Sequence, residues 1–77
     1  MPAVTVRLHG GLERHVGRAD PLVVDLPPGA TLLELQDWLH IPRGEVGLFL
    51  VDGELRREAD VPVADARVDL YPMFGGG

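Results

Sequence analysis

Residues 67–77 read RVDLYPMFGGG, an alternating segment that leads directly into three consecutive glycines. Valine and leucine alternate here with charged residues and a tyrosine, which predicts a strand with one buried face. Pro72 cannot donate a hydrogen bond to a sheet ladder, so it belongs at an edge or at the exit of that strand. We therefore expect a strand over Arg67–Tyr71 that carries a glycine segment at its end, and the rest of the chain has to supply its neighbours.

Two segments in the first third of the chain are candidate neighbours. Ala3–Leu8 (AVTVRL) alternates and predicts a half-buried strand, and Pro21–Leu26 (PLVVDL) predicts a second, short strand. The glycine-containing stretch between them reads as a loop. Leu12 and Val16 stand four residues apart in it, so one short helical turn is expected to attach the loop to the core.

A single helix is predicted over residues 31–40, TLLELQDWLH. Thr31 and Glu34 have the spacing of a capping box, in which each residue satisfies the other's backbone N–H. Pro42 ends the helix soon afterwards. Trp38 flanks the apolar stripe and is expected at the edge of the core. The leucines spaced at i, i+3 and i+7 form that stripe: Leu32, Leu35 and Leu39.

The nearly continuous apolar run Val46–Val51 (VGLFLV) predicts a central strand buried on both faces. Asp52-Gly53 signals a tight turn after it. The polar residues 54–65 are expected to form a short strand or a turn. The order strand, strand, helix, strand, weak strand, strand predicts an α+β fold, in which a mixed sheet of four to five strands packs on one main helix.

Length and composition limit the class of function. A chain of 77 residues allows one domain, and its net charge of −5 argues against binding to nucleic acid or to anionic membranes. A basic partner surface would be favoured instead. Cysteine is absent, and no apolar run approaches the length of a membrane helix. We expect a cytoplasmic protein.

No convincing catalytic set or metal site is visible. His9 and His15 are six residues apart, which is not a metal-ligand spacing on a helix. We expect each histidine, including His40, to lie at the surface or in a loop. The acidic residues of the second half read as a solvated loop or, alternatively, as a docking surface for a basic partner: Glu54, Glu58 and Asp60.

Taken together, the chain resembles the ubiquitin-like, or β-grasp, proteins, and more narrowly the MoaD/ThiS family of sulfur carriers. The resemblance implies a β-grasp domain over residues 1–74 and a flexible glycine tail over residues 75–77. Two features depart from the family pattern: the tail has three glycines instead of two, and Asp65-Ala66-Arg67 lacks the usual turn glycine. The matching segments span nearly the whole chain: VTVRLHGGLERHVG, PPGATLLELQDWL, VGLFLVDG and RVDLYPMFGGG.

The resemblance implies that the chain is a protein substrate and carrier, with no catalytic residue and no bound cofactor of its own. The carboxylate of Gly77 would be adenylated and then converted into a thiocarboxylate by a ubiquitin-activating-like adenylyltransferase/sulfurtransferase, which uses ATP and Mg²⁺. Gly75 and Gly76 would be the recognised part of the tail, because residues without Cβ can thread a narrow channel. A sulfur-acceptor synthase would follow, in molybdopterin, thiazole, cysteine, thiolated-tRNA or sulfur-containing natural product biosynthesis.

A docking surface is expected beside the tail. If Val46, Leu48 and Leu50 face the helix, then Phe49 and Val51 point away from it, near Tyr71 and Phe74. Such an apolar patch would suit an activating enzyme. Alternatively, residues 10–20 or 54–65 cover it.

Two other functions stay open at this point. The chain could be a ubiquitin-like modifier that is joined through Gly77 to lysines of other proteins. It could also be a β-grasp interaction module in which the tail has no role.

Overall fold

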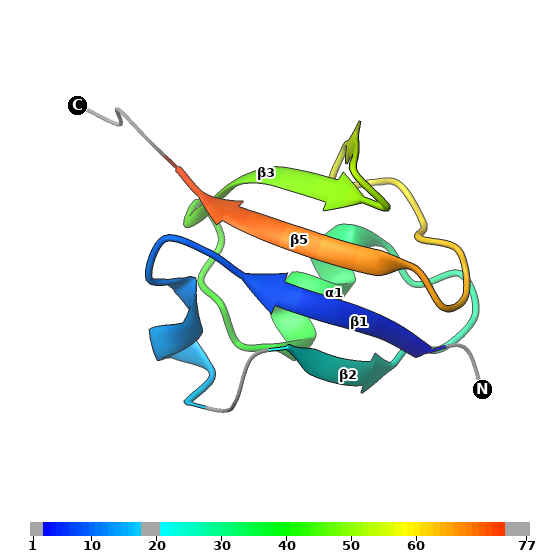
Figure 1. Ribbon diagram of the computed structural model, residues 1–77, viewed down its shortest axis with the longest axis horizontal. Coiled ribbons are helices and arrows are strands. Elements are labelled where there is room, and N and C mark those ends of the chain that lie inside the picture. Colours follow the sequence, from blue (N-terminus) through cyan, green and yellow to red (C-terminus); the bar gives the residue numbers. More distant parts are fainter. Residues whose placement is uncertain (1–2, 18–20, 74–77) are drawn as a thin grey trace.

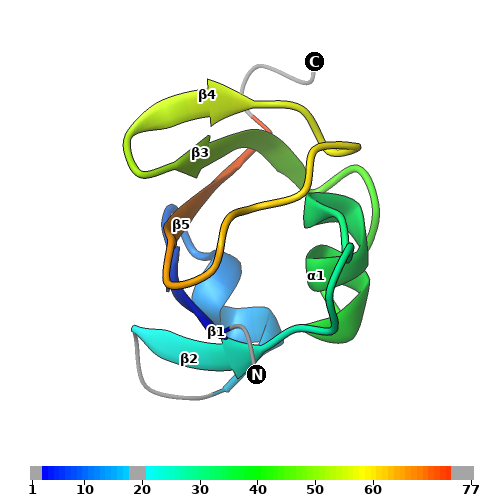
Figure 2. The same ribbon diagram turned by 90° about the vertical axis from the view of Figure 1, so that its right-hand side faces the viewer.

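The computed structural model describes residues 3–17 and 21–73. It confirms the predicted α+β fold: a five-stranded mixed sheet packs with one face on a single α-helix (Figures 1 and 2). A short 3₁₀ helix, η1, lies in the loop after the first strand. The elements are β1 (Ala3–Leu8), η1 (Leu12–His15), β2 (Leu22–Asp25), α1 (Leu32–Trp38), β3 (Val46–Val51), β4 (Glu54–Arg56) and β5 (Arg67–Pro72).

The strand order is β2-β1-β5-β3-β4, so the last strand in the sequence is the central one (Figure 1). β5 runs parallel to β1, with Leu8 opposite Leu70, and antiparallel to β3, with Val51 opposite Val68. β2 and β4 form the two edges as antiparallel neighbours of β1 and β3. The expectation that Val46–Val51 is a central strand buried on both faces is therefore wrong. β3 is an inner strand between β5 and β4, its outer face is partly exposed, and β5 is the central strand.

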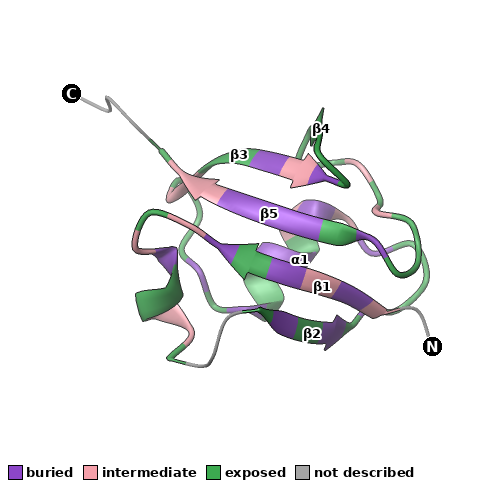
Figure 3. Cartoon of the chain, viewed as in Figure 1, coloured by how far each residue is buried: buried purple, intermediate pink, exposed green. Residues whose placement is uncertain are grey.

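The core lies between the sheet and α1, and alternate residues of the strands supply one side of it (Figure 3). Val6, Val68 and Leu70 are fully buried. The predicted helical turn in the first loop is confirmed, since η1 brings Leu12 into the core and Val16 packs against the same cluster. A continuous apolar layer thus supports the sheet from the side of α1.

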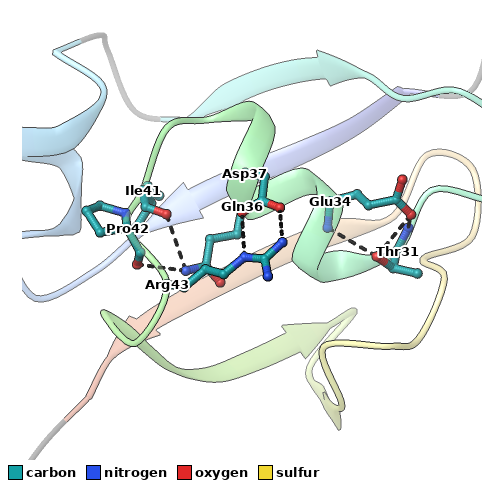
Figure 4. Close-up of polar contacts among 7 residues, drawn as sticks. All are labelled: Thr31, Glu34, Gln36, Asp37, Ile41, Pro42 and Arg43. Atoms are coloured by element: carbon teal, nitrogen blue, oxygen red, sulfur yellow. Dashed lines mark hydrogen bonds and ion pairs between the residues drawn. The ribbon is translucent and has the colours of Figure 1, made fainter.

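The capping box that begins α1 is confirmed (Figure 4). The Glu34 backbone N–H donates to Thr31 Oγ1 at 3.1 Å, and the Thr31 N–H donates to Glu34 Oε1 at 3.1 Å. The leucine stripe is buried as predicted. Trp38 was predicted at the core edge, but 54% of its surface is exposed, because it lies at the last position of α1 and outside the stripe.

The segment after α1 is fixed by the buried side chain of Gln36 (Figure 4). Its Nε2 donates to the carbonyl of Pro42 at 2.9 Å and approaches the carbonyl of Ile41 at 3.4 Å. Arg43 then folds back on Asp37 through two hydrogen bonds, of 2.7 and 3.2 Å. The helix end is therefore tied to the loop that leads into β3.

Two turns depend on aspartates with left-handed backbone. Asp52 and Gly53 both have positive φ, 51° and 84°, as the tight turn between β3 and β4 requires. Before β5, Asp65 has φ 63°, so the positive φ of this turn lies at Asp65 and not at Ala66, the position of the glycine in the family pattern. Aspartate is one of the few residues other than glycine that tolerate this region.

Candidate functional site

The candidate site is the end of β5, from which the glycine segment continues. Pro72 is paired with Val46 of β3, and the Met73 N–H donates to the carbonyl of Glu45 at 2.9 Å. On the β1 side, the His9 N–H donates to the carbonyl of Leu70 at 3.0 Å. Both neighbouring strands therefore hold the final residues of the central strand in place.

The predicted tail residues lie outside the described part of the chain. These are Phe74, Gly75, Gly76 and Gly77, together with the predicted domain boundary between residues 74 and 75. Their roles stay predictions.

The predicted orientation of β3 is wrong. Phe49 and Val51 face the core and are buried, whereas Leu48 is 39% exposed on the opposite face. The reason is a register shift between Val46 and Leu48, where β3 has one residue more than β5 across the pair. Because side chains alternate along a strand, one extra residue reverses every later position. Val46 thus packs against the core as predicted, and the residues after Gly47 do not follow its alternation.

An apolar surface nevertheless lies beside the end of β5, built from other residues than those predicted. Leu48 is opposite Tyr71, and Leu50 of β3 is opposite Leu55 of β4. Leu50 and Tyr71 are half-buried, and Leu55 is exposed. We call this surface, on the sheet face away from α1, the outer patch: Leu48, Leu50, Leu55 and Tyr71. Of the three predicted docking residues that the structure describes, Phe49, Val51 and Tyr71, only Tyr71 belongs to it.

A polar cluster borders the outer patch and was missed by sequence reasoning. Asp69 of β5 is only 8% exposed, and its Oδ1 lies 3.0 Å from Nε2 of His9. Its Oδ2 lies 3.5 Å from Nε of Arg67. The His9 ring stacks on the Tyr71 ring, with centroids 4.3 Å apart and planes inclined by 6°. The alternation of β5 places Asp69 and Tyr71 on one face, but nothing in the sequence joins them to a histidine sixty residues away.

The acidic stretch of the second half supports the helix through its backbone. The N–H groups of Leu32 and Leu33, at the start of α1, donate to the carbonyls of Asp60 and Glu58 at 2.9 Å each. The Asp60 carboxylate in turn accepts from the Arg57 N–H at 2.9 Å. These bonds satisfy helix N–H groups that have no partner within the helix.

A groove of about 420 Å³ lies on the other side of the molecule, beside α1. Its two acidic groups already have partners, because Glu34 belongs to the capping box and Asp37 is bound by Arg43. The hydrogen bond from the Arg43 guanidinium, aided by its charge, lowers the pKa of the Asp37 carboxyl below its ordinary value. The groove is lined by Leu26, Pro27, Ala30, Glu34, Asp37 and Trp38.

Neither a metal cluster nor a membrane span is present in the described part of the chain. Within residues 3–17 and 21–73, no three His, Asp or Glu side chains are grouped so that they could hold a metal ion. Over the same residues, no helix is both long and apolar enough to cross a membrane.

Neither a protein-family model nor a curated protein sequence matches the chain. Solved structures match it over nearly its full length. Small archaeal modifier protein 1 (SAMP1) from Haloferax volcanii has a TM-score of 0.73 at 20% identity, covering 97% of this chain and 99% of that one. A protein assigned as subunit 1 of molybdopterin converting factor from Pyrococcus furiosus has a TM-score of 0.77 at 16% identity, covering 94% and 98%.

A third match is the complex of subunits 1 and 2 of molybdopterin-converting factor from Helicobacter pylori. It has a TM-score of 0.60 at 21% identity and covers 97% of this chain and 99% of the matching chain. These likenesses establish that the chain has the β-grasp fold of MoaD-like and SAMP proteins, as the sequence resemblance predicted.

Proposed function

We propose that this chain is a sulfur carrier whose Gly77 carboxylate is adenylated and then converted into a thiocarboxylate. The observation that carries the proposal is the position of the glycine run. It follows Pro72 and Met73 at the end of a central strand that is hydrogen-bonded on both sides. The likeness to small β-grasp proteins named as a modifier and as converting-factor subunits supports it.

The proposed reaction uses the Gly77 carboxylate of this chain, and the other reacting groups come from partner proteins and ATP. A free carboxylate is a poor electrophile, so its oxygen first attacks the α-phosphorus of ATP, and pyrophosphate leaves. A persulfide on the partner or on a sulfur donor then attacks the acyl carbon, and AMP leaves. Reduction of the resulting acyl disulfide by a thiol releases the thiocarboxylate. Every reacting group besides the carboxylate belongs to partners, so the chain acts as a substrate and carrier.

The outer patch is the surface we propose for docking of the ubiquitin-activating-like enzyme. It adjoins the end of β5 and contains two leucines that are well exposed, Leu48 and Leu55. Apolar side chains that are buried in an interface favour binding through the apolar area that they remove from water. Leu48→Glu or Leu55→Glu is expected to weaken binding, whereas Val23→Glu, an exposed apolar position on edge strand β2, is the matched control.

Intact-protein mass spectrometry after isolation from cells tests the carrier function. We expect a species with sulfur in place of one oxygen, localised to the C-terminal peptide. The same spectrum shows whether the natural chain ends at Gly77, as the proposal requires. A chain that continues beyond Gly77 without trimming would contradict it.

Gly76→Ala tests the role of the tail. We expect slower adenylation with the fold retained, because a Cβ obstructs passage through a narrow channel. Gly44→Ala, at a loop glycine with φ 91° and no neighbouring atom within 4 Å of the added Cβ, adds backbone strain away from the tail and controls for a general loss of stability. Adenylation of Gly76→Ala at the wild-type rate would refute the proposed role of the tail.

A ubiquitin-like modifier is the second candidate, and the likeness to small archaeal modifier protein 1 favours it. It needs the same adenylation step but ends in an isopeptide bond to a lysine. All seven basic residues of this chain are arginines, so the adducts could not contain lysine-linked chains of the protein itself. Denaturing gels that show higher-mass adducts, each with a single copy, would favour this function.

The acceptor of the sulfur is proposed to be a synthase. The converting-factor complex from Helicobacter pylori joins a similar chain to a second subunit, which favours a role as the small subunit of such an assembly. Co-purification with the product of a neighbouring gene would identify the pathway. Full function after deletion of residues 75–77 would instead indicate an interaction module.

A further inference from the structure

Two glycines flank the end of β5 from opposite sides. Gly10 follows β1, which is one neighbour of β5, and Gly47 lies in β3, which is the other. Gly10 approaches the ring of Pro72, and Gly47 approaches the Pro72 carbonyl oxygen and the backbone of Met73, the last described residue before the proposed tail. We call Gly10 and Gly47 the glycine collar.

Gly10 leaves no room for a side chain. A Cβ built on it would lie 2.5 Å from Cγ and 2.7 Å from Cδ of Pro72. The pyrrolidine ring is rigid, so the clash could be relieved only by moving Pro72 or the loop that follows β1. The neighbouring bond from the His9 N–H to the Leu70 carbonyl holds that loop against β5.

At Gly47 an added side chain would be opposed by contact and not by backbone conformation. Its φ is not positive, so its backbone conformation would accept alanine. A Cβ there would nevertheless lie 3.0 Å from both Met73 Cα and the Pro72 carbonyl oxygen. Those are backbone atoms, and the adjacent bond from the Met73 N–H to the Glu45 carbonyl holds them close. The glycine at the register shift of β3 therefore permits the close approach of the end of β5.

We propose that Gly10 and Gly47 are positioning residues that fix the point and direction from which the tail leaves the domain. This inference rests on the proposed carrier function. A carboxylate that must reach an ATP site while the outer patch is docked needs a defined starting point, because small displacements of a reacting group can slow a reaction by about 100-fold. Neither glycine belongs to the outer patch, so binding of the enzyme should not depend on them.

Gly10→Ala is the principal variant, and Gly17→Ala is its matched control. Gly17 has φ 65°, against 61° at Gly10, but an added Cβ at Gly17 meets no atom within 4 Å. Both variants therefore carry the same backbone strain, and only Gly10→Ala displaces Pro72. Gly47→Ala adds contact without that strain, and Gly10→Ala/Pro72→Ala removes the Cγ and Cδ atoms with which the new Cβ collides.

The assay uses the full chain and the ubiquitin-activating-like enzyme that adenylates the wild type, followed by ATP–pyrophosphate exchange. We expect Gly10→Ala to lower kcat about 10- to 100-fold with KM changed less than about twofold, and Gly47→Ala to lower it less. Gly17→Ala should keep the wild-type kcat, and the double variant should recover most of the loss when it is compared with Pro72→Ala alone. Equal kcat for Gly10→Ala and Gly17→Ala, or a double variant as slow as Gly10→Ala, would overturn the proposal.

A second measurement does not depend on activity. Hydrogen exchange of the Met73 N–H, which is bonded to the Glu45 carbonyl, should accelerate in Gly47→Ala relative to exchange at Val68 in the middle of β5. Unchanged exchange in Gly47→Ala would count against the collar. If the wild type itself forms no adenylate, the proposed function has failed; if the wild type is active and the collar variants match it, only this inference has failed.

Discussion

At the scale of single residues, two aspartates hold the start of β5 against its neighbours through hydrogen bonds. Asp52 joins the end of β3 to the start of β5 through two hydrogen bonds. Its N–H donates to the Arg67 carbonyl at 2.8 Å, and its Oδ1 accepts from the Arg67 N–H at 2.9 Å. Asp65 supplies a left-handed turn directly before β5, and its N–H donates to the Ala3 carbonyl at 2.7 Å. The start of the central strand is therefore attached on both sides, as its end is.

Asp37 gives a pH-dependent prediction at the same scale. Arg43 lowers the pKa of Asp37 in the folded state, so the pair stabilises the protein above the ordinary carboxyl pKa of about 4. That contribution is lost as the pH falls through the lowered pKa. We expect Asp37→Asn to be less stable than the wild type at pH 7 and the difference to shrink in strong acid. Urea unfolding at several pH values measures it, and a difference independent of pH would contradict the assignment.

Contacts between residues close in the sequence could be predicted, whereas contacts that depend on strand pairing could not. Thr31 and Glu34 are three residues apart, so their capping box was predictable from local spacing. The turn at Asp65 has a positive φ, which could not be predicted with certainty. Aspartate tolerates the left-handed region but also adopts the ordinary backbone conformations. The contact of His9 with Asp69 depends on the pairing of β1 with β5, which no local pattern reveals.

At the scale of elements, the capping box should contribute measurably to the stability of α1. Thr31→Ala removes the acceptor for the Glu34 N–H and is expected to lower the free energy of unfolding by about 1 kcal/mol. Glu34→Gln keeps an acceptor for the Thr31 N–H and is the conservative control. Urea unfolding followed by circular dichroism compares them, and equal loss in both variants would show that the box itself contributes nothing.

The register of β3 gives the sharpest test of the fold. Phe49→Ala should cost about 3–5 kcal/mol because Phe49 is in the core. Leu48→Ala, one residue earlier on the outer patch, should cost less than about 1 kcal/mol. Chemical denaturation distinguishes the two. Greater loss in Leu48→Ala would mean that the strand has the opposite orientation.

Element boundaries were well predicted, and the faces of β3 were not. Alternation in Ala3–Leu8 and Arg67–Tyr71 is regular, and both strands are found where the pattern indicates. In β3 nearly every residue is apolar, so the sequence carries no contrast between faces and conceals the shift at Gly47. The predicted patch consequently had the right strands, but its two β3 residues, Phe49 and Val51, lie in the core.

At the scale of the whole molecule, the net charge of −5 should govern how fast partners associate. If the activating enzyme presents a basic surface, the association rate constant should fall as salt is raised from low to physiological concentration, with little change in the dissociation rate constant. Surface plasmon resonance or stopped flow at two ionic strengths measures both. An association rate that does not respond to salt would contradict electrostatic attraction.

The place of the central strand has a consequence for synthesis in the cell. β5 is made after the other four strands, yet it separates β1 from β3, so the nascent chain has two hairpins and no sheet to join them until β5 leaves the ribosome. Pairing of β1 with β5 closes a loop of about sixty residues, which is among the slower steps in folding. The domain therefore cannot close until the strand that leads into the glycine segment has left the ribosome, and a chain without β5 has neither the closed sheet nor that segment.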